Sequence, residues 1–199
     1  MTNTPRIKPS GPNDWTDAAR EMFAFFEGPE AREKGSNSNM VLTIAHHPKL
    51  AFAYMKFGGR LLGAPKLSAR LREMIALYIG WRNKAEYEWV QHVAIGRDAG
   101  ITDDEFEALK VGAEAPNWIG LERAVLRATE QLLGQARIDD ETWNSLAAEL
   151  DTQQLIELLF VIGNYGMLSW IINAFGIQPE TDAKAIDAMA DNARGRIKT

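Results

Sequence analysis

Apolar residues recur at helical spacing along most of the chain of 199 residues. In the segment 69–81, Leu71, Ile75 and Tyr78 fall on one stripe, with the spacing of a helix that faces a hydrophobic core. Three charged residues lie off that stripe, namely Arg70, Arg72 and Glu73. No stretch shows the two-residue alternation between turn residues that predicts a half-buried strand. The pattern therefore predicts an all-α protein.

Capping and turn residues mark where the helices begin and end. Ser68 is a good N-cap, Thr102 and Glu105 form a capping box, and Pro48 can open a helix. Helices are predicted at 15–26, 40–45, 48–63, 69–81 and 85–98, from 102 onward, and at 121–133, 141–150 and 153–175. Residues 31–38 are expected to form a polar connection, and 184–197 either a peripheral helix or a mobile tail.

The uncharged segment 158–175 is about as long as a minimal membrane-spanning helix. However, Asn164 and Asn173 are polar, Gly163 and Gly166 weaken the segment, and no cluster of Lys or Arg follows it to set an orientation. We therefore interpret it as a core helix buried on all sides and expect no membrane partner.

Composition narrows the possible functions. The formal net charge is -5 and the isoelectric point is near 5.3, so the clustered basic surface that nucleic-acid binding needs is not expected. The chain has no cysteine, which excludes disulfides, thiolate metal ligands and thiol nucleophiles. The first residues lack the pattern of a secretory signal, so a single domain in the cytoplasm is the default expectation.

One helical face carries the residue types of an acid–base site. Because successive helical residues turn by about 100°, Glu88 and His92 are neighbours on a face that also holds Trp89. Ala85 and Gly96 are small and are expected to leave space above and below the pair, so that Trp89 lines a pocket for a small organic substrate. The same spacing also fits a helix-stabilising ion pair at a partly exposed edge. Periodicity alone leaves both interpretations open.

Other kinds of site find little support in the sequence. The chain has three histidines, and His46 and His47 next to Pro48 are more typical of a turn than of a site. One histidine and one glutamate on a helix turn are too few ligands for a metal ion, and no HExxH pattern is present. The sequence also lacks a glycine-rich phosphate loop and a serine-nucleophile motif. We therefore expect neither a metal nor a cofactor.

Three motifs surround the acid–base face: Arg72-Glu-Met-Ile, Glu86-Tyr-Glu-Trp-Val-Gln-His92 and Ala99-Gly-Ile-Thr102. Together they resemble the carboxymuconolactone decarboxylase family, which includes the AhpD-like alkylhydroperoxidases. The resemblance implies an AhpD-like helical bundle that assembles as a homo-oligomer, either trimers or hexamers built from them. It also implies an N-terminal helix and connection at 1–39, a carboxymuconolactone decarboxylase-like domain at 40–178, and a C-terminal helix or tail at 179–199.

In the peroxidase branch of that family, a Cys-x-x-Cys pair precedes a histidine, and a glutamate lies further upstream. Carried onto this sequence, the histidine is His92 and the glutamate is Glu73, while the cysteine positions fall on Ala85 and Glu88. Neither alanine nor glutamate can attack a peroxide oxygen as a thiolate does. The resemblance therefore implies acid–base chemistry, as on the decarboxylase side of the family, and not a thiol peroxidase.

The residues and the resemblance together predict a cofactor-independent lyase that acts on a small carboxylated or cyclic organic molecule. In this hypothesis His92 transfers a proton, Glu88 holds the tautomer of His92, and Glu73 completes a relay. The candidate substrate-binding residues are Tyr87, Trp89, Arg72, Arg82, Tyr165 and His46. The alternatives are another proton-transfer enzyme in the same pocket, such as an isomerase or hydratase, and a non-catalytic oligomeric binding protein.

Overall fold

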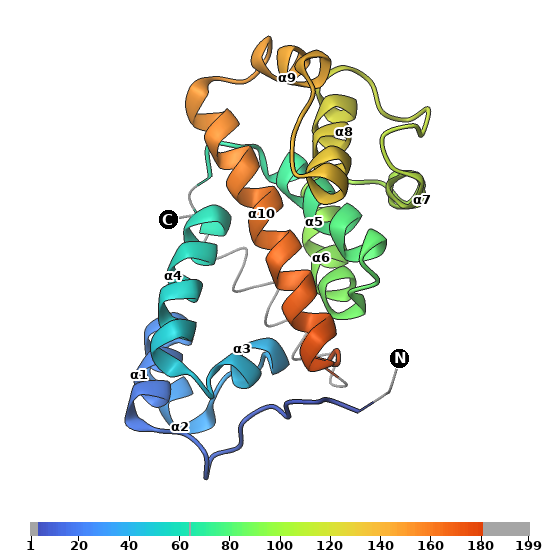
Figure 1. Ribbon diagram of the computed structural model, residues 1–199. Coiled ribbons are helices and arrows are strands. Elements are labelled where there is room, and N and C mark those ends of the chain that lie inside the picture. Colours follow the sequence, from blue (N-terminus) through green and yellow to red (C-terminus); the bar gives the residue numbers. More distant parts are fainter. Residues whose placement is uncertain (1–3, 64, 181–199) are drawn as a thin grey trace. The chain divides into compact units, whose positions relative to one another are not determined.

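The computed structural model describes residues 4–63 and 65–180. All regular elements in this described part are α-helices, which confirms the predicted all-α class (Figure 1). They are α1 (Asp17–Glu27), α2 (Ala31–Lys34), α3 (Asn39–Ile44), α4 (Pro48–Gly63), α5 (Ala69–Arg82), α6 (Glu86–Asp98), α7 (Asp103–Val111), α8 (Gly120–Gln135), α9 (Asp140–Ala147) and α10 (Thr152–Phe175). The region 184–197, expected to be a helix or a tail, lies outside the described residues.

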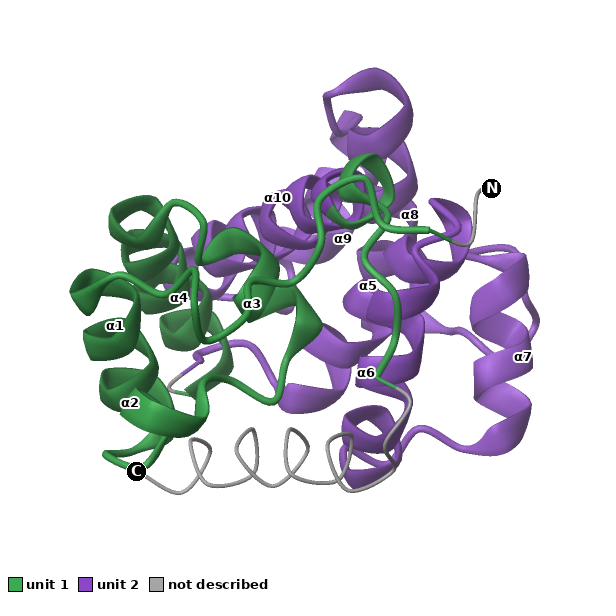
Figure 2. Cartoon of the chain, turned by 90° about the horizontal axis from the view of Figure 1, so that it is seen from below, with its two compact units in different colours: residues 1–64, 172–199 green, residues 65–171 purple. Residues whose placement is uncertain are grey.

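The chain divides into two compact units (Figure 2). One comprises residues 1–64 and 172–199, and the other comprises residues 65–171. These boundaries differ from the expected ones at 39/40 and 178/179. All predicted site residues except His46 belong to the unit 65–171. The candidate chemistry can therefore be described within that unit alone.

The first unit has its own small hydrophobic core. Met22 and Phe23 of α1 are each 1% exposed and pack in a cluster with Val41 of α3. The hydroxyl of Ser38 caps α3 by accepting a hydrogen bond from a backbone nitrogen in its first turn. Pro48 opens α4 as predicted, because a proline at the first helical position leaves no unpaired N–H group.

Helix α2 was not predicted, because the segment 31–38 was expected to be a connection only. It is a single turn of four residues closed by Gly35, whose φ is 77°. One turn is too short to show a periodic apolar pattern, so the sequence gives little sign of it. The longer helices begin and end within a few residues of the predicted limits because their caps are well marked.

Helix α5 is the centre of the unit 65–171, where it packs against α6, α7 and α8. Every residue from Leu71 to Gly80 is buried. Arg72 and Glu73, which lie off the apolar stripe, are nevertheless 0% exposed. A helix that is covered on all sides has no solvent face, so its charged side chains need partners inside the unit.

Two glycines allow α5 and α6 to pack closely. A Cβ atom at Gly80 would lie 3.2 Å from the backbone nitrogen of Trp89, and one at Gly96 would lie 2.9 Å from Cδ1 of Leu77. The prediction that Gly96 leaves space beside the acid–base pair is therefore wrong, because core side chains already fill that position. The two helices form a tight pair with no room between them at these points.

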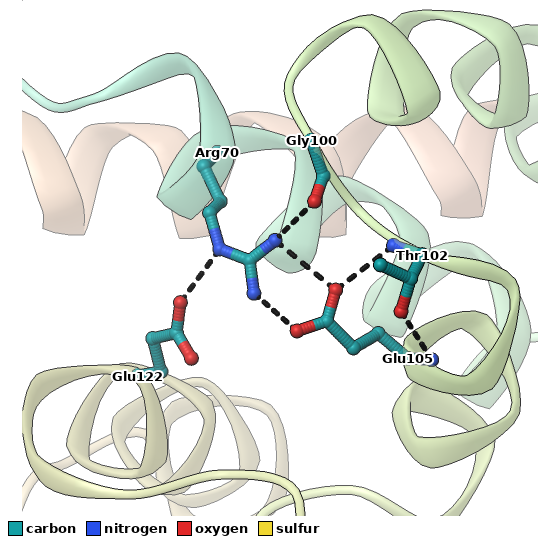
Figure 3. Close-up of polar contacts among 5 residues, drawn as sticks. All are labelled: Arg70, Gly100, Thr102, Glu105 and Glu122. Carbon is teal, nitrogen blue, oxygen red and sulfur yellow. Dashed lines mark hydrogen bonds and ion pairs between the residues drawn. The ribbon is translucent and has the colours of Figure 1, made fainter.

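A network around Arg70 connects the start of α5 with three other segments (Figure 3). Nε of Arg70 donates to Glu122 of α8 at 2.7 Å, and Nη2 donates to Glu105 of α7 at 2.6 Å. Nη1 donates to the carbonyl oxygen of Gly100 at 2.7 Å. Glu105 also accepts from the backbone nitrogen of Thr102 at 2.9 Å, within the predicted capping box. The hydrogen bonds with Glu105 and Glu122 raise the pKa of Arg70.

Among the described residues, α10 is the one helix that is long and apolar enough to cross a membrane, by length and composition only. Half of its most apolar window is buried inside the structure. Leu158 and Val161 are 0% exposed, whereas Ile156 is 54% and Trp170 is 62% exposed. The prediction that this helix is buried on all sides is therefore wrong. Helix α10 therefore has one face on the core and one face exposed.

Replacing Arg70 by methionine should lower the free energy of unfolding by about 2 kcal/mol, because two partly buried carboxylates lose their common partner. Urea denaturation measures the change. The control is Arg127→Met, since Arg127 pairs with Glu114 nearer the surface, where an ion pair contributes less than about 1 kcal/mol. Equal effects of the two substitutions would contradict the structural role given to the Arg70 network.

Replacing Gly80 by alanine should lower the free energy of unfolding by about 1–3 kcal/mol, because the added methyl group forces α5 and α6 apart. Gly134→Ala on α8 is the matched control. Its Cβ atom would meet only the end of Arg82, at 3.9 Å, so the better helix propensity should add up to about 1 kcal/mol of stability. Thermal unfolding of both variants should show shifts of opposite sign, and shifts of the same sign would refute the proposed close packing.

Candidate active site

The centre of the site is the carboxylate of Glu73 on α5, which is 0% exposed. Its Oε2 atom accepts a hydrogen bond from Nδ1 of His92 at 2.6 Å. Its Oε1 atom accepts one from Nε of Arg72 at 2.8 Å. Each carboxylate oxygen therefore has one nitrogen donor, one from the neighbouring residue on α5 and one from α6.

Glu73 is ionised although it is buried. Burial by itself raises the pKa of a carboxyl group, but His92 and Arg72 together outweigh this effect, so the pKa of Glu73 is lowered. An ionised carboxylate can only accept hydrogen bonds, so Nδ1 of His92 carries the hydrogen. In a neutral His92 ring the basic lone pair is then on Nε2.

Tyr165 of α10 helps to fix the orientation of the His92 ring. The two rings are in T-shaped contact, with their centroids 5.0 Å apart and an angle of 90° between their planes. Tyr165 is 6% exposed, and the side chain of His92 is 12% exposed. The imidazole is thus held by a carboxylate and an aromatic ring while a small part of it stays open. Four of the predicted residues come together here: Arg72, Glu73, His92 and Tyr165.

Glu88 lies outside these hydrogen bonds. Its side chain is 1% exposed, and neither carboxylate oxygen has a hydrogen-bond partner in the described part of the chain. It packs against α5, where a Cβ atom at Gly80 would lie 3.6 Å from Cβ of Glu88. Burial raises the pKa of Glu88 well above its usual value. The prediction that Glu88 holds the tautomer of His92 is therefore wrong, because Glu73 on the adjacent helix occupies that position.

Arg72 is buried, and its position therefore differs from that of a residue that binds substrate at the surface. It is 0% exposed and its Nε atom bonds to Glu73, while Nη1 and Nη2 have no hydrogen-bond partner among residues 4–63 and 65–180. The contact that the structure shows is therefore one that orients and ionises Glu73. Sequence reasoning missed this contact, because residues adjacent on a helix do not normally face each other.

Trp89 belongs to an aromatic cluster on α5, α6 and α7. Its ring centroid is 5.5 Å from that of Trp81 and 6.2 Å from that of Phe106. The ammonium group of Lys110 lies 5.7 Å from the centroid of the Trp89 ring. These contacts account for Trp89 as a packing residue, so its predicted contact with substrate receives no support from them.

The other predicted substrate-binding residues are spread over the chain. Arg82, at the exposed end of α5, donates to the hydroxyl of Tyr78 at 3.1 Å. Tyr87 is 4% exposed in the first turn of α6. His46 belongs to the other unit, where its Nε2 atom lies 3.1 Å from the carbonyl oxygen of Lys8. The hydrogen bond of Arg82 to Tyr78 is separate from those that Glu73 forms with Arg72 and His92.

The arrangement of Glu73 and His92 is suited to proton transfer. A histidine with a basic Nε2 atom can accept a proton from a substrate, and the ionised Glu73 stabilises the imidazolium that forms. Within the described residues, no group of three or more His, Cys, Asp or Glu side chains could hold a metal ion. The hydrogen bond between Glu73 and His92 itself points to acid–base chemistry.

Comparisons with known proteins show what the segment that carries this site is similar to. A sequence model of the Carboxymuconolactone decarboxylase family matches residues 48–131, a segment that contains Arg72, Glu73, Glu88 and His92. No curated protein matches the chain.

Several solved structures share the fold. An uncharacterized peroxidase-related protein from Silicibacter sp. TM1040 is 20% identical, with a TM-score of 0.72 over 91% of this chain and 96% of that one. An alkylhydroperoxidase AhpD core protein from Ralstonia eutropha JMP134 is 18% identical, with a TM-score of 0.69 over 90% and 95%. The debrominase Bmp8 is 20% identical, with a TM-score of 0.67 over 94% and 97%.

At these identities the solved structures show the fold, and the family match identifies the segment that carries Glu73 and His92. Both agree with the resemblance found in the sequence. Residues 48–131 therefore match the carboxymuconolactone decarboxylase family, and the chain, which has no cysteine, has an AhpD-like fold.

Proposed function

We propose that the protein is a cofactor-independent lyase that uses His92 and Glu73 to move a proton on a small carboxylated or cyclic organic substrate. The observation that carries the proposal is the buried hydrogen bond between Nδ1 of His92 and Glu73, at 2.6 Å. Loss of carbon dioxide from a β-keto acid or a carboxylated lactone leaves an enolate, which then needs a proton. His92 supplies that proton from Nε2 as the imidazolium that Glu73 stabilises. The neutral ring then takes a proton back from solvent, so no cofactor has to take part.

Glu88 gives the site a second titratable carboxyl group, and its protonation state is opposite to that of Glu73. Its pKa is raised by burial, whereas the pKa of Glu73 is lowered by its neighbours. Pairs of groups whose environments separate their pKa values are typical of acid–base sites, with one group as proton donor and the other as part of the base. In this proposal the protonated Glu88 is a proton donor that lies one turn away from His92 on α6.

The absence of cysteine supports this chemistry over peroxide reduction by a thiolate. The debrominase Bmp8 supports an enzymatic role for the fold, but at 20% identity its reaction does not transfer to this chain. The same residues would also serve an isomerase or a hydratase. Tyr165 is the substrate contact best placed for any of these reactions, because it touches His92. We place the enzyme in the cytoplasm.

Replacing His92 by glutamine should abolish turnover, with a loss of at least about 100-fold in kcat, because the proton carrier is removed. The assay is release of carbon dioxide from a panel of β-keto acids and carboxylated lactones by the full chain. The matched control is His47→Gln, at an exposed position in the other unit. Circular dichroism and mass in solution should stay unchanged in both variants. Full activity of His92→Gln would rule out the proposed mechanism, and turnover of no compound would favour a binding protein.

Replacing Glu88 by glutamine should stabilise the protein increasingly as the pH rises from about 5 to about 8. Above about pH 4.5 the unfolded chain releases the Glu88 proton while the folded chain keeps it, which costs up to about 1.4 kcal/mol per pH unit until the folded pKa is reached. Glutamine does not titrate and escapes this cost. Urea denaturation at several pH values measures the difference, with Glu86→Gln on the same helix as the exposed control. A difference that stays constant with pH would show that Glu88 is ionised in the folded protein.

A further inference from the structure

The side chain of Arg72 has two nitrogen atoms without a hydrogen-bond partner among the described residues. Its Nε atom donates to Glu73 at 2.8 Å, whereas Nη1 and Nη2 have no acceptor there, although both atoms are buried. A buried donor without an acceptor is costly, and a charged donor costs more than a neutral one. A molecule that brings an acceptor atom to these two nitrogens is therefore stabilised where it binds.

The free edge of the Arg72 guanidinium is fixed before any molecule binds. The group is planar, so the hydrogen bond from Nε to Glu73 also orients Nη1 and Nη2. The side chain is 0% exposed, and the packing around it limits its movement. Two donors held in this way form a fork for an anionic oxygen. They need little rearrangement when negative charge develops on a reacting molecule.

The carboxylate of Glu73 joins this fork to the proton carrier. One of its oxygens accepts from Nε of Arg72 and the other from Nδ1 of His92, at 2.8 and 2.6 Å. Because both groups bind the same carboxylate, Nη1 and Nη2 lie at most about 12 Å from Nε2 of His92, a separation that a small cyclic molecule bridges with a hydrogen bond at each end. The side chain of His92 is 12% exposed, so this part of the site is open to solvent.

We propose that Nη1 and Nη2 of Arg72 form an oxyanion-binding site, which in the proposed lyase takes the enolate oxygen. This inference rests on the proposed function for its reaction. When the bond to the departing carboxylate breaks, its electron pair moves toward the neighbouring carbonyl group, carbon dioxide leaves, and the carbonyl oxygen becomes negative at the fork. The imidazolium of His92 then gives its proton to the enolate carbon, and the carbonyl group forms again.

The charges of the site balance at the enolate stage. Arg72 is positive and Glu73 is ionised, so these two charges cancel. Glu88 is protonated and adds none. The imidazolium of His92 is then the one remaining charge among these four side chains, and an anion at the fork neutralises it. An oxyanion is therefore favoured there in the protonation state in which His92 can donate a proton.

The carboxylate that is lost is a poorer partner for Arg72 than the enolate oxygen. Its charge disappears as carbon dioxide forms, so a guanidinium bound to it would stabilise the substrate more than the transition state and would slow the reaction. The carbonyl oxygen gains charge in the same step, so the same contact lowers the barrier there. The direction of charge movement thus selects the enolate oxygen for the fork of Arg72.

4-Nitrophenol tests the oxyanion site without turnover, because its phenolate absorbs visible light and its neutral form does not. At a pH just below the range in which the free compound ionises, the wild type should bind the phenolate, so visible absorbance should rise and saturate. Arg72→Lys keeps the positive charge but loses the fork, and it should bind the phenolate at least about 10-fold more weakly. The matched control is Arg127→Lys, in a pair with Glu114 nearer the surface, which should bind like the wild type. No rise with the wild type, or equal binding by a folded Arg72→Lys, would overturn the proposal.

A crystal structure of the wild type with 4-nitrophenol decides the position of the oxygen without any variant. The phenolate oxygen should lie about 3 Å from Nη1 or Nη2 of Arg72. An oxygen bound elsewhere, with water on both nitrogens, would overturn the proposal even if Arg72→Lys does not fold. Phenolate at Arg72 without turnover of any β-keto acid or lactone would support the oxyanion site and refute the lyase. Turnover without phenolate at Arg72 would refute the oxyanion site and leave the lyase standing.

Discussion

A carboxylate at the centre of a helical unit needs partners, and Glu73 obtains them from Arg72 and His92. Isolated charges are too costly to bury, so the three side chains stabilise one another only in this arrangement. The same contacts keep Glu73 ionised and decide which nitrogen of His92 carries the hydrogen. Stability of the unit and readiness for proton transfer therefore depend on one group of hydrogen bonds.

The helices could be predicted well from the sequence because their ends carry local signals. Ser68 caps α5, and the capping box at Thr102 opens α7, as expected. The predictions failed where tertiary contacts decide the outcome. Helix α5 has an apolar stripe, which normally indicates one buried face, but it is covered on all sides and buries its charged residues as well. Gly96 was expected to leave a space, and a side chain from α5 fills it.

Only part of the candidate site could be predicted from the sequence, and the reason is similar. Helical spacing places Glu88 near His92, but periodicity says nothing about residues on the next helix, and Glu73 entered only through the family resemblance. The structure shows that Glu73 is the partner of His92 and that Glu88 has no hydrogen-bond partner in the described part of the chain. Two glutamates of one site thus differ in protonation because one has nitrogen donors and the other has none.

The pairing of α5 with α6 also bears on how the site forms and how it can change. Arg72, Glu73, Glu88 and His92 all come from one helical hairpin, so the contacts among them close only short loops of chain. Contacts of this kind form early and cost little chain entropy during folding. A site contained in one hairpin can also acquire new chemistry through a few local substitutions, while α7, α8 and α10 continue to provide the same frame.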